Sequence, residues 1–222
     1  STGATYTGTT GPIGTSTTWN LSRSATDWGA RIDGNILDLT NDASAAGNVN
    51  GWAYANTSTA AFLSPYNTTL GSNTSLVTWT FNMRQIRTDP AGFAAGSYGV
   101  AFVLGLNAGT GYAVMLGQAG AVDPVRLTRF VGGITSGTLT DIIISNTAGL
   151  TDFGNEYLSV KVTYDPATNT WELFLRNDGT TAFSDPTTGT LTSQGTAVDN
   201  TYTGISLVTM GGYWQGSTAA NQ

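Results

Sequence analysis

The sequence predicts an all-β protein in which two antiparallel sheets pack face to face in a jelly-roll arrangement. Apolar and polar residues alternate in several short segments, as expected of strands with one buried face. Turn residues separate these segments at intervals of roughly ten residues. The composition, with 29 glycines and only 10% charged residues, favours strands and turns over helices. A hydrophobic fraction of 40% is sufficient to build a core.

The clearest element is a hairpin over residues 157–177, YLSVKVTYDPATNTWELFLRN. Its expected inward-facing side chains are Leu158, Val160, Val162, Tyr164, Trp171, Leu173 and Leu175. Residues 165–169, DPATN, have the composition of a turn. The register should pair Tyr164 with Trp171, because a slip of one residue would turn the apolar set outward. Val162 then lies opposite Leu173, and Val160 opposite Leu175.

Other strands are expected, in chain order, at residues 36–39, 52–55, 59–63, 77–84, 98–106, 111–117, 125–130, 142–144 and 202–214. The strand at 77–84 alternates so that Trp79, Phe81 and Met83 face inward. The strands at 98–106 and 111–117 are nearly continuous in apolar residues, and should be covered on both faces. The last strand should return beside an early one. The long loops at 87–97 and 178–190 are places where function is expected.

The chain of 222 residues is expected to form one sandwich at residues 19–214. Residues 1–18, rich in Gly, Thr and Ser, are expected to be a linker or an N-terminal edge segment, and residues 215–222 a tail. The abrupt start at Ser1 is consistent with an excised domain or a processed form. No apolar run approaches the roughly 20 residues that span a bilayer.

Composition excludes several kinds of chemistry. The chain has no Cys and no His, which removes disulfides, thiolate metal sites, Cys nucleophiles and His-based triads. Its net charge of −6 and scattered arginines give no basic patch for nucleic acid. Low charge, a single lysine and abundant Thr, Gly and Asn indicate an extracellular or cell-surface protein of bacterial type.

The hairpin resembles the strand pair of concanavalin A-like lectin/glucanase and laminin-G-like domains, in which "v-x-v-x-y-D" is followed by "x-W-x-L-x-v". Residues 111–130, GYAVMLGQAGAVDPVRLTRF, are similar to a run in uncharacterised jelly-roll domains of Bacteroidetes-type secreted or cell-surface proteins. The resemblance covers residues 79–176 well and the flanks poorly. It implies a concanavalin A-like fold, which hosts lectins, enzymes and passive spacers alike.

Enzymatic activity is the weaker expectation. Glycoside hydrolysis needs two carboxylates flanking the bond, and the glucanase relatives carry them as an acidic run on one strand. Glu156 and Glu172 are the only glutamates and lie far apart in sequence. The lyase relatives use a Tyr/His pair, which a chain without His does not complete. A polysaccharide-degrading hydrolase or lyase therefore stays as the less favoured alternative.

A carbohydrate-binding site needs aromatic rings for stacking and polar groups for hydroxyls. The aromatic candidates are Trp52, Tyr54, Tyr98, Tyr213 and Trp214. Core packing is the competing explanation for Trp52, Tyr54, Tyr213 and Trp214. Arg84 and Arg126 could pair with uronate or sulfate groups.

Asp38, Asn41 and Asp42 place oxygen atoms at close spacing and could help to hold Ca²⁺; the alternative is an Asx turn. The sequence thus predicts an extracellular, non-catalytic, lectin-like adhesion module. Its partner would be a polysaccharide or glycan, and it would be a monomeric domain of a larger chain. The alternative is a ligand-free structural spacer of a large surface adhesin.

Overall fold

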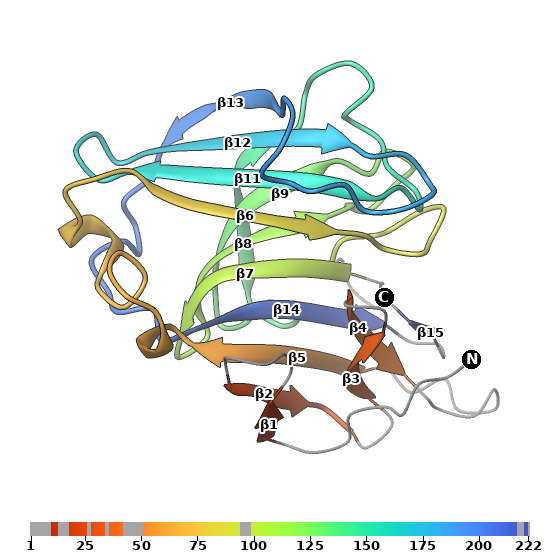
Figure 1. The fold of residues 1–222 in the computed structure, drawn as a ribbon, viewed down its shortest axis with the longest axis horizontal. Helices are drawn as coiled ribbons and strands as arrows, with labels where there is room; N and C mark the ends of the chain where they lie inside the picture. Colours follow the sequence, from red (N-terminus) through yellow and green to blue (C-terminus); the bar gives the residue numbers. More distant parts are fainter. Residues whose placement is uncertain are drawn as a thin grey trace.

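The computed structural model describes residues 10–12, 18–25, 28–33, 36–41, 51–93, 99–216 and 220–221. One layer is an eight-stranded antiparallel sheet with the order β1-β2-β5-β14-β7-β8-β9-β10 (Figure 1). Its strands are β1 (Thr10–Pro12), β2 (Thr18–Arg23), β5 (Gly51–Ser58), β14 (Thr209–Gly216), β7 (Gly99–Asn107), β8 (Thr110–Leu116), β9 (Val125–Val131) and β10 (Thr138–Ile144). None of the helices in the described part of the chain is long and apolar enough to cross a membrane.

Two smaller antiparallel sheets complete the fold. The first has the order β13-β12-β11-β6 and the second the order β15-β4-β3. Their strands are β6 (Val77–Met83), β11 (Leu158–Asp165), β12 (Thr170–Asn177), β13 (Thr192–Val198), β3 (Trp28–Asp33), β4 (Ile36–Asn41) and β15 (Ala220–Asn221). The prediction of an all-β, two-layer antiparallel sandwich is therefore confirmed.

Both smaller sheets cover the same face of the eight-stranded sheet. Val100 on β7 and Trp214 on β14 are direct partners, so their side chains point to one face. Val100 packs in the core under the four-stranded sheet, whereas Trp214 packs with Trp28 and Leu39 of the three-stranded sheet. The two small sheets consequently lie side by side, and a seam runs between them. Figure 1 shows β6 on one side of this seam and β3–β4 on the other.

The hairpin forms in the predicted register. Tyr164 pairs with Trp171, Val162 with Leu173 and Val160 with Leu175. Strand β6 adds to the other edge of β11 and alternates as expected, with Trp79, Phe81 and Met83 buried. Trp171 is at the centre of this core, stacked on Trp79 with ring centroids 5.8 Å apart. Its indole N–H donates to the backbone oxygen of Asp199 at 2.9 Å.

Three predicted strands differ from the structure. Residues 59–61 form a 3-10 helix, because Thr59 turns inward and its hydroxyl donates to the oxygen of Leu207. Strand β10 begins before the predicted residues 142–144. It is an edge strand with a bulge between Asp141 and Ile143, so only Ile143 is buried and Ile144 is 44% exposed. The last strand begins at Thr209 rather than at residue 202, because residues 201–204 form a turn.

The chain ends also contribute strands. Thr10–Pro12, within the segment expected to be a linker or edge, pairs with β2. Ala220–Asn221, within the expected tail, pairs with β4. The final long strand, β14, lies between β5 and β7, so it returns beside an early strand as predicted.

Candidate functional site: a cleft between the two small sheets

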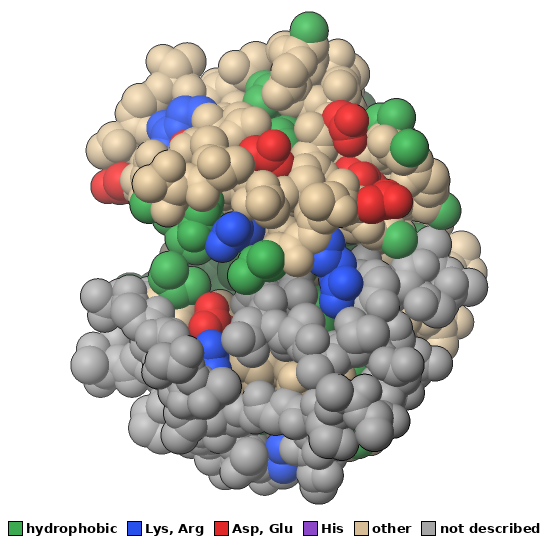
Figure 2. All heavy atoms as spheres, turned by 90° about the vertical axis from the view of Figure 1, so that its right-hand side faces the viewer, with side chains coloured by type: hydrophobic (Ala, Val, Ile, Leu, Met, Phe, Trp, Pro, Cys, Tyr) green, Lys and Arg blue, Asp and Glu red, His purple; other side chains and the backbone are tan. Residues whose placement is uncertain are grey.

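The seam between the small sheets opens into a cleft of about 330 Å³. One wall comes from β2 and β4, through Trp19 and residues 36–39, and the other from the end of β6 with Tyr157 and Phe183. The floor is the eight-stranded sheet, through residues 100–102 of β7 and Gly212 of β14. Figure 2 shows the side of the molecule on which β6 ends, where hydrophobic and basic side chains gather around a hollow.

β6 is an edge strand of the four-stranded sheet, so residues from both of its faces line the cleft where it ends. Met83 faces the core and contributes an apolar side chain to the wall that the end of β6 forms. Asn82 faces the opposite side, where its amide nitrogen donates to the backbone oxygen of Ser184 at 3.0 Å and to the hydroxyl of Ser159 at 3.2 Å. Arg84 directly follows Met83, the last residue of the strand, and its side chain lies along the rim.

Arg84 is held by hydrogen bonds to uncharged groups. Its Nε donates to the backbone oxygen of Asn155 at 2.8 Å, and its Nη1 donates to the phenol oxygen of Tyr157 at 2.9 Å. The centre of the guanidinium group lies 4.1 Å from the centroid of the Tyr157 ring, a cation–π distance. No ion pair joins Arg84 to a carboxylate of the described residues.

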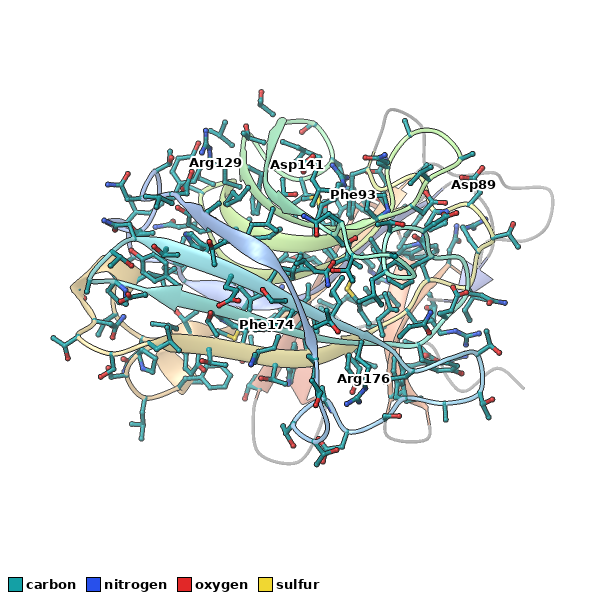
Figure 3. The ribbon with its side chains drawn as sticks, turned by 90° about the horizontal axis from the view of Figure 1, so that it is seen from above. Asp89, Phe93, Arg129, Asp141, Phe174 and Arg176 are labelled. Atoms are coloured by element: carbon teal, nitrogen blue, oxygen red, sulfur yellow. The ribbon has the colours of Figure 1, made fainter. Side chains whose placement is uncertain are left out.

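An aromatic pair forms the wall beside Arg84. Tyr157 and Phe183 meet edge to face, with ring centroids 4.6 Å apart and an interplanar angle of 88°. Phe183 belongs to the loop at 178–190, which Arg176 fastens to the four-stranded sheet. Arg176 donates from Nε to Asp178 at 2.6 Å and from Nη2 to the hydroxyl of Ser159 at 2.9 Å. Figure 3 shows Arg176 beside this loop, on the side of the molecule opposite Phe93 and Asp141.

The facing wall carries the carboxylate of Asp38. Its Oδ2 accepts a hydrogen bond from Nε of Arg31 at 3.2 Å, across the β3–β4 pair. Asp38 is the only acidic side chain among the described residues that line the cleft. The cleft therefore combines an apolar floor, aromatic walls and polar groups at its rim.

The structure also brings together three of the predicted aromatic residues, on the other face of the eight-stranded sheet. The ring of Tyr213 is stacked on Trp52 at 5.5 Å and contacts Tyr54 at 5.4 Å. Phe93 contacts Tyr213 edge to face at 5.8 Å. Tyr54 is 6% exposed and Tyr213 is 8% exposed, so both rings are mainly packed against their neighbours. Trp52, at the margin of the cluster, is half-buried. Burial raises the pKa of both phenols above the ordinary value.

Other predicted site residues have structural contacts. Trp214 is 0% exposed and packs on Trp28 at 4.5 Å, so its ring has no face for a ligand. Arg126 is buried on the face that carries Tyr213, and its donors bond to Gly117, Gly92 and Asp141. It holds the two loops that follow β6 and β8 and forms an ion pair with Asp141. Tyr98 lies outside the described residues.

The predicted Ca²⁺ ligands do not fit a common ion. Asp38 and Asn41 both lie in β4, three positions apart, so their side chains point to opposite faces of the three-stranded sheet. Asp38 pairs with Arg31, and Asp42 lies outside the described residues. Within the described residues, no group of three or more His, Cys, Asp or Glu side chains is arranged to hold a metal ion.

A second group of carboxylates lies beyond the end of β6. Asp123 is 2% exposed, its Oδ1 has no hydrogen-bond partner, and its backbone N–H donates to Asp152 at 3.1 Å. Burial raises the pKa of Asp123 to about 6, and the nearby charges of Asp89 and Asp152 act in the same direction. The stability of the fold therefore depends on pH through this group.

Sequence reasoning missed Trp19, Tyr157 and Phe183. The alternation of the hairpin places Tyr157 on its outer face, which is correct, but nothing in the local sequence indicates that Arg84 reaches it from β6. Phe183 is a single aromatic residue in a polar loop. Its place in the loop at 178–190 was the one indication in the sequence, because loops on a rigid sandwich are where binding residues tend to lie.

No protein-family model matches the chain, and no curated protein sequence matches it. Among solved structures, it is similar to a peanut lectin bound to a nine-residue peptide, with 15% identity, 98% of this chain and 92% of that chain covered, and a TM-score of 0.45. Arcelin-5, a lectin-like defense protein from Phaseolus vulgaris, has 15% identity, coverages of 90% and 87%, and a TM-score of 0.43. The metal-free lectin I-B4 from Griffonia simplicifolia has 10% identity, coverages of 91% and 87%, and a TM-score of 0.45. These similarities concern the arrangement of strands, and they lend no support to a laminin-G-like relationship or a Bacteroidetes origin.

Proposed function

We propose that the protein is a non-catalytic carbohydrate-binding module and that its site is the cleft between the two small sheets. The main support for this proposal is that aromatic and polar side chains line the same cleft. The aromatic side chains are those of Trp19, Tyr157 and Phe183, and the polar side chains are those of Asn82 and Arg84. Apolar sugar faces stack on aromatic rings, while sugar hydroxyls exchange hydrogen bonds with amide, carboxylate and guanidinium groups.

The size and chemistry of the cleft support binding rather than hydrolysis. A volume of about 330 Å³ is at the lower end for ligand pockets, large enough for a short oligosaccharide segment. Glycoside hydrolysis uses two carboxylates flanking the bond, and the described lining residues offer the carboxylate of Asp38 alone. We further propose an extracellular or cell-surface location, where polysaccharides are available to an adhesion module.

The test is a glycan-binding screen with variants that change one surface at a time. Ile36→Trp places a large ring in the mouth of the cleft, at a residue that is already 39% exposed, and should abolish every hit. Val198→Trp makes a similar change at a 73% exposed position of β13 and should keep all hits.

The variant Trp52→Ala tests the alternative site, the aromatic cluster on the other face of the eight-stranded sheet. Hits that disappear in Ile36→Trp and persist in Trp52→Ala support the cleft. Hits that disappear in Trp52→Ala alone would move the site to the aromatic cluster around Tyr213. A blank screen from folded protein, with and without Ca²⁺, would contradict carbohydrate binding and favour the spacer alternative.

A further inference from the structure

Arg84 differs from the other arginines whose ion pairs the structure defines. Four arginines are paired with aspartates: Arg31 with Asp38, Arg126 with Asp141, Arg129 with Asp199 and Arg176 with Asp178. Arg84 forms no ion pair among the described residues, although it is half-buried at the rim of the cleft. A guanidinium group that is partly removed from water without a counter-ion is a favourable place for an anion.

The hydrogen bonds of Arg84 use two of its three guanidinium nitrogens and leave the third available to a ligand. Nε and Nη1 are used by Asn155 and Tyr157, and both acceptors are neutral. Nη2 donates no hydrogen bond within the described residues. The contacts with Tyr157 therefore fix the orientation of the guanidinium group before a ligand arrives, which reduces the entropy lost on binding.

The surroundings would strengthen a charge interaction at Arg84. Met83, Ile86 and Phe102 line the same cleft, and apolar walls exclude water and lower the local dielectric. The protein as a whole has a net charge of −6, so it has no general attraction for anions. Anion binding by this protein would consequently be specific to a site.

We infer that the cleft selects acidic glycans, with Arg84 binding the carboxylate of a uronic acid or the sulfate ester of a sulfated sugar. This inference rests on the proposed carbohydrate function of the same cleft. The anionic group would sit at Nη2 of Arg84, and the hydroxyls of the same or the next sugar would extend toward Asp38 on the facing wall. The carboxylate of Asp38 accepts hydrogen bonds and donates none, so it suits the hydroxyls of the ligand rather than a second anionic group, and the two walls fix the direction of the ligand.

The experiment compares short oligosaccharides of equal length by calorimetric titration: a neutral one, a uronate-containing one and a sulfated one. Hexanoate serves as an apolar anion without hydroxyls. In Arg84→Met, affinity for the acidic ligands should fall roughly 10- to 100-fold, the loss expected for a charge-assisted hydrogen bond. Arg84→Lys should recover part of the loss, because lysine keeps the charge without the planar fork.

Two controls separate this effect from a change in net charge and test whether the acidic ligands bind electrostatically. Lys161→Met removes a positive charge at a residue that contacts Phe174 on the outer face of the four-stranded sheet and does not line the cleft; it should leave all affinities within about twofold. In the wild-type protein, raising NaCl from about 0.05 to 0.5 M should weaken binding of the acidic ligands and leave the neutral one unchanged. The relative affinity for the uronate-containing and the sulfated ligand shows which anion the site prefers.

The outcomes distinguish the inference from the function it rests on. Equal affinity for neutral and acidic oligosaccharides, unchanged in Arg84→Met, would refute the acidic preference and leave carbohydrate binding intact. No binding of any oligosaccharide would refute both. Hexanoate binding as tightly as the uronate ligand would show an apolar-anion site and refute the carbohydrate function.

Discussion

Arg176 should contribute strongly to stability, because it fastens the loop at 178–190 that carries Phe183. It donates hydrogen bonds to the carboxylate of Asp178, the hydroxyl of Ser159 and the backbone oxygens of Asp185 and Thr188. The perturbation is Arg176→Met, which keeps the aliphatic stem and removes the guanidinium group. The side chain of Asp178 is 1% exposed, so it would remain buried without its counter-ion.

The expected loss of stability follows because the variant removes only one partner of the ion pair and leaves the other buried. Breaking a buried ion pair by removing one partner costs about 3–5 kcal/mol. The side chain of Arg176 is itself 23% exposed, and Asp178 keeps its hydrogen bond from Ser159 at 2.7 Å. Both facts place the loss of stability at the lower end of this range, so we expect the free energy of unfolding to fall by about 3 kcal/mol.

Urea unfolding followed by tryptophan fluorescence measures this loss, since Trp79 and Trp171 lie in the core beneath the same sheet. A double-mutant cycle with Asp178→Asn isolates the pair, and its coupling energy should be about 1–3 kcal/mol. A loss below about 1 kcal/mol, or additive single and double variants, would refute the reasoning. Because Phe183 forms part of the wall, Arg176→Met should also weaken any ligand bound in the cleft.

Two further predictions concern stability alone. Asp123 has a pKa raised to about 6 in the folded state from 3.8. The folded protein therefore holds a proton that the unfolded chain has lost, and stability falls as pH rises from about 4 to 6; Asp123→Asn should remove this slope and raise the unfolding free energy at pH 7 by roughly 1–2 kcal/mol in urea titrations. An unchanged slope in the variant would assign the pH dependence to other groups. Gly92 has φ +58°, and a Cβ there would lie 2.0 Å from the oxygen of Gly117. Gly92→Ala should lower the thermal unfolding midpoint by several degrees, the shift expected for roughly 2 kcal/mol, whereas Gly204→Ala, with no atom within 4 Å of the added carbon, should leave it unchanged. Equal midpoints for the two variants would contradict the close approach of the two loops.

Local sequence patterns determined the strands with one buried face. The hairpin register from Val160 to Leu175 was predictable, because period-two alternation leaves one register in which every apolar side chain faces the core. The absence of His and Cys likewise limits the available chemistry through composition alone. The prediction of a strand at 59–63 was wrong, because Thr59 bonds to Leu207, a residue 148 positions away. The strand predicted at 202–214 begins only at Thr209, because residues 201–204 form a turn.

Tertiary structure alone decided the site. Trp52 and Trp214 both stand in short aromatic segments, beside Tyr54 and Tyr213, and the local sequence does not distinguish them. Trp214 is buried under the three-stranded sheet, while Trp52 lies at the margin of the opposite face. The face that a strand buries depends on which sheet covers it, and no local pattern records that. The residues Arg84, Tyr157 and Phe183 come from three distant segments, and they meet only because β6 pairs with β11 and the loop after β12 folds back over their ends.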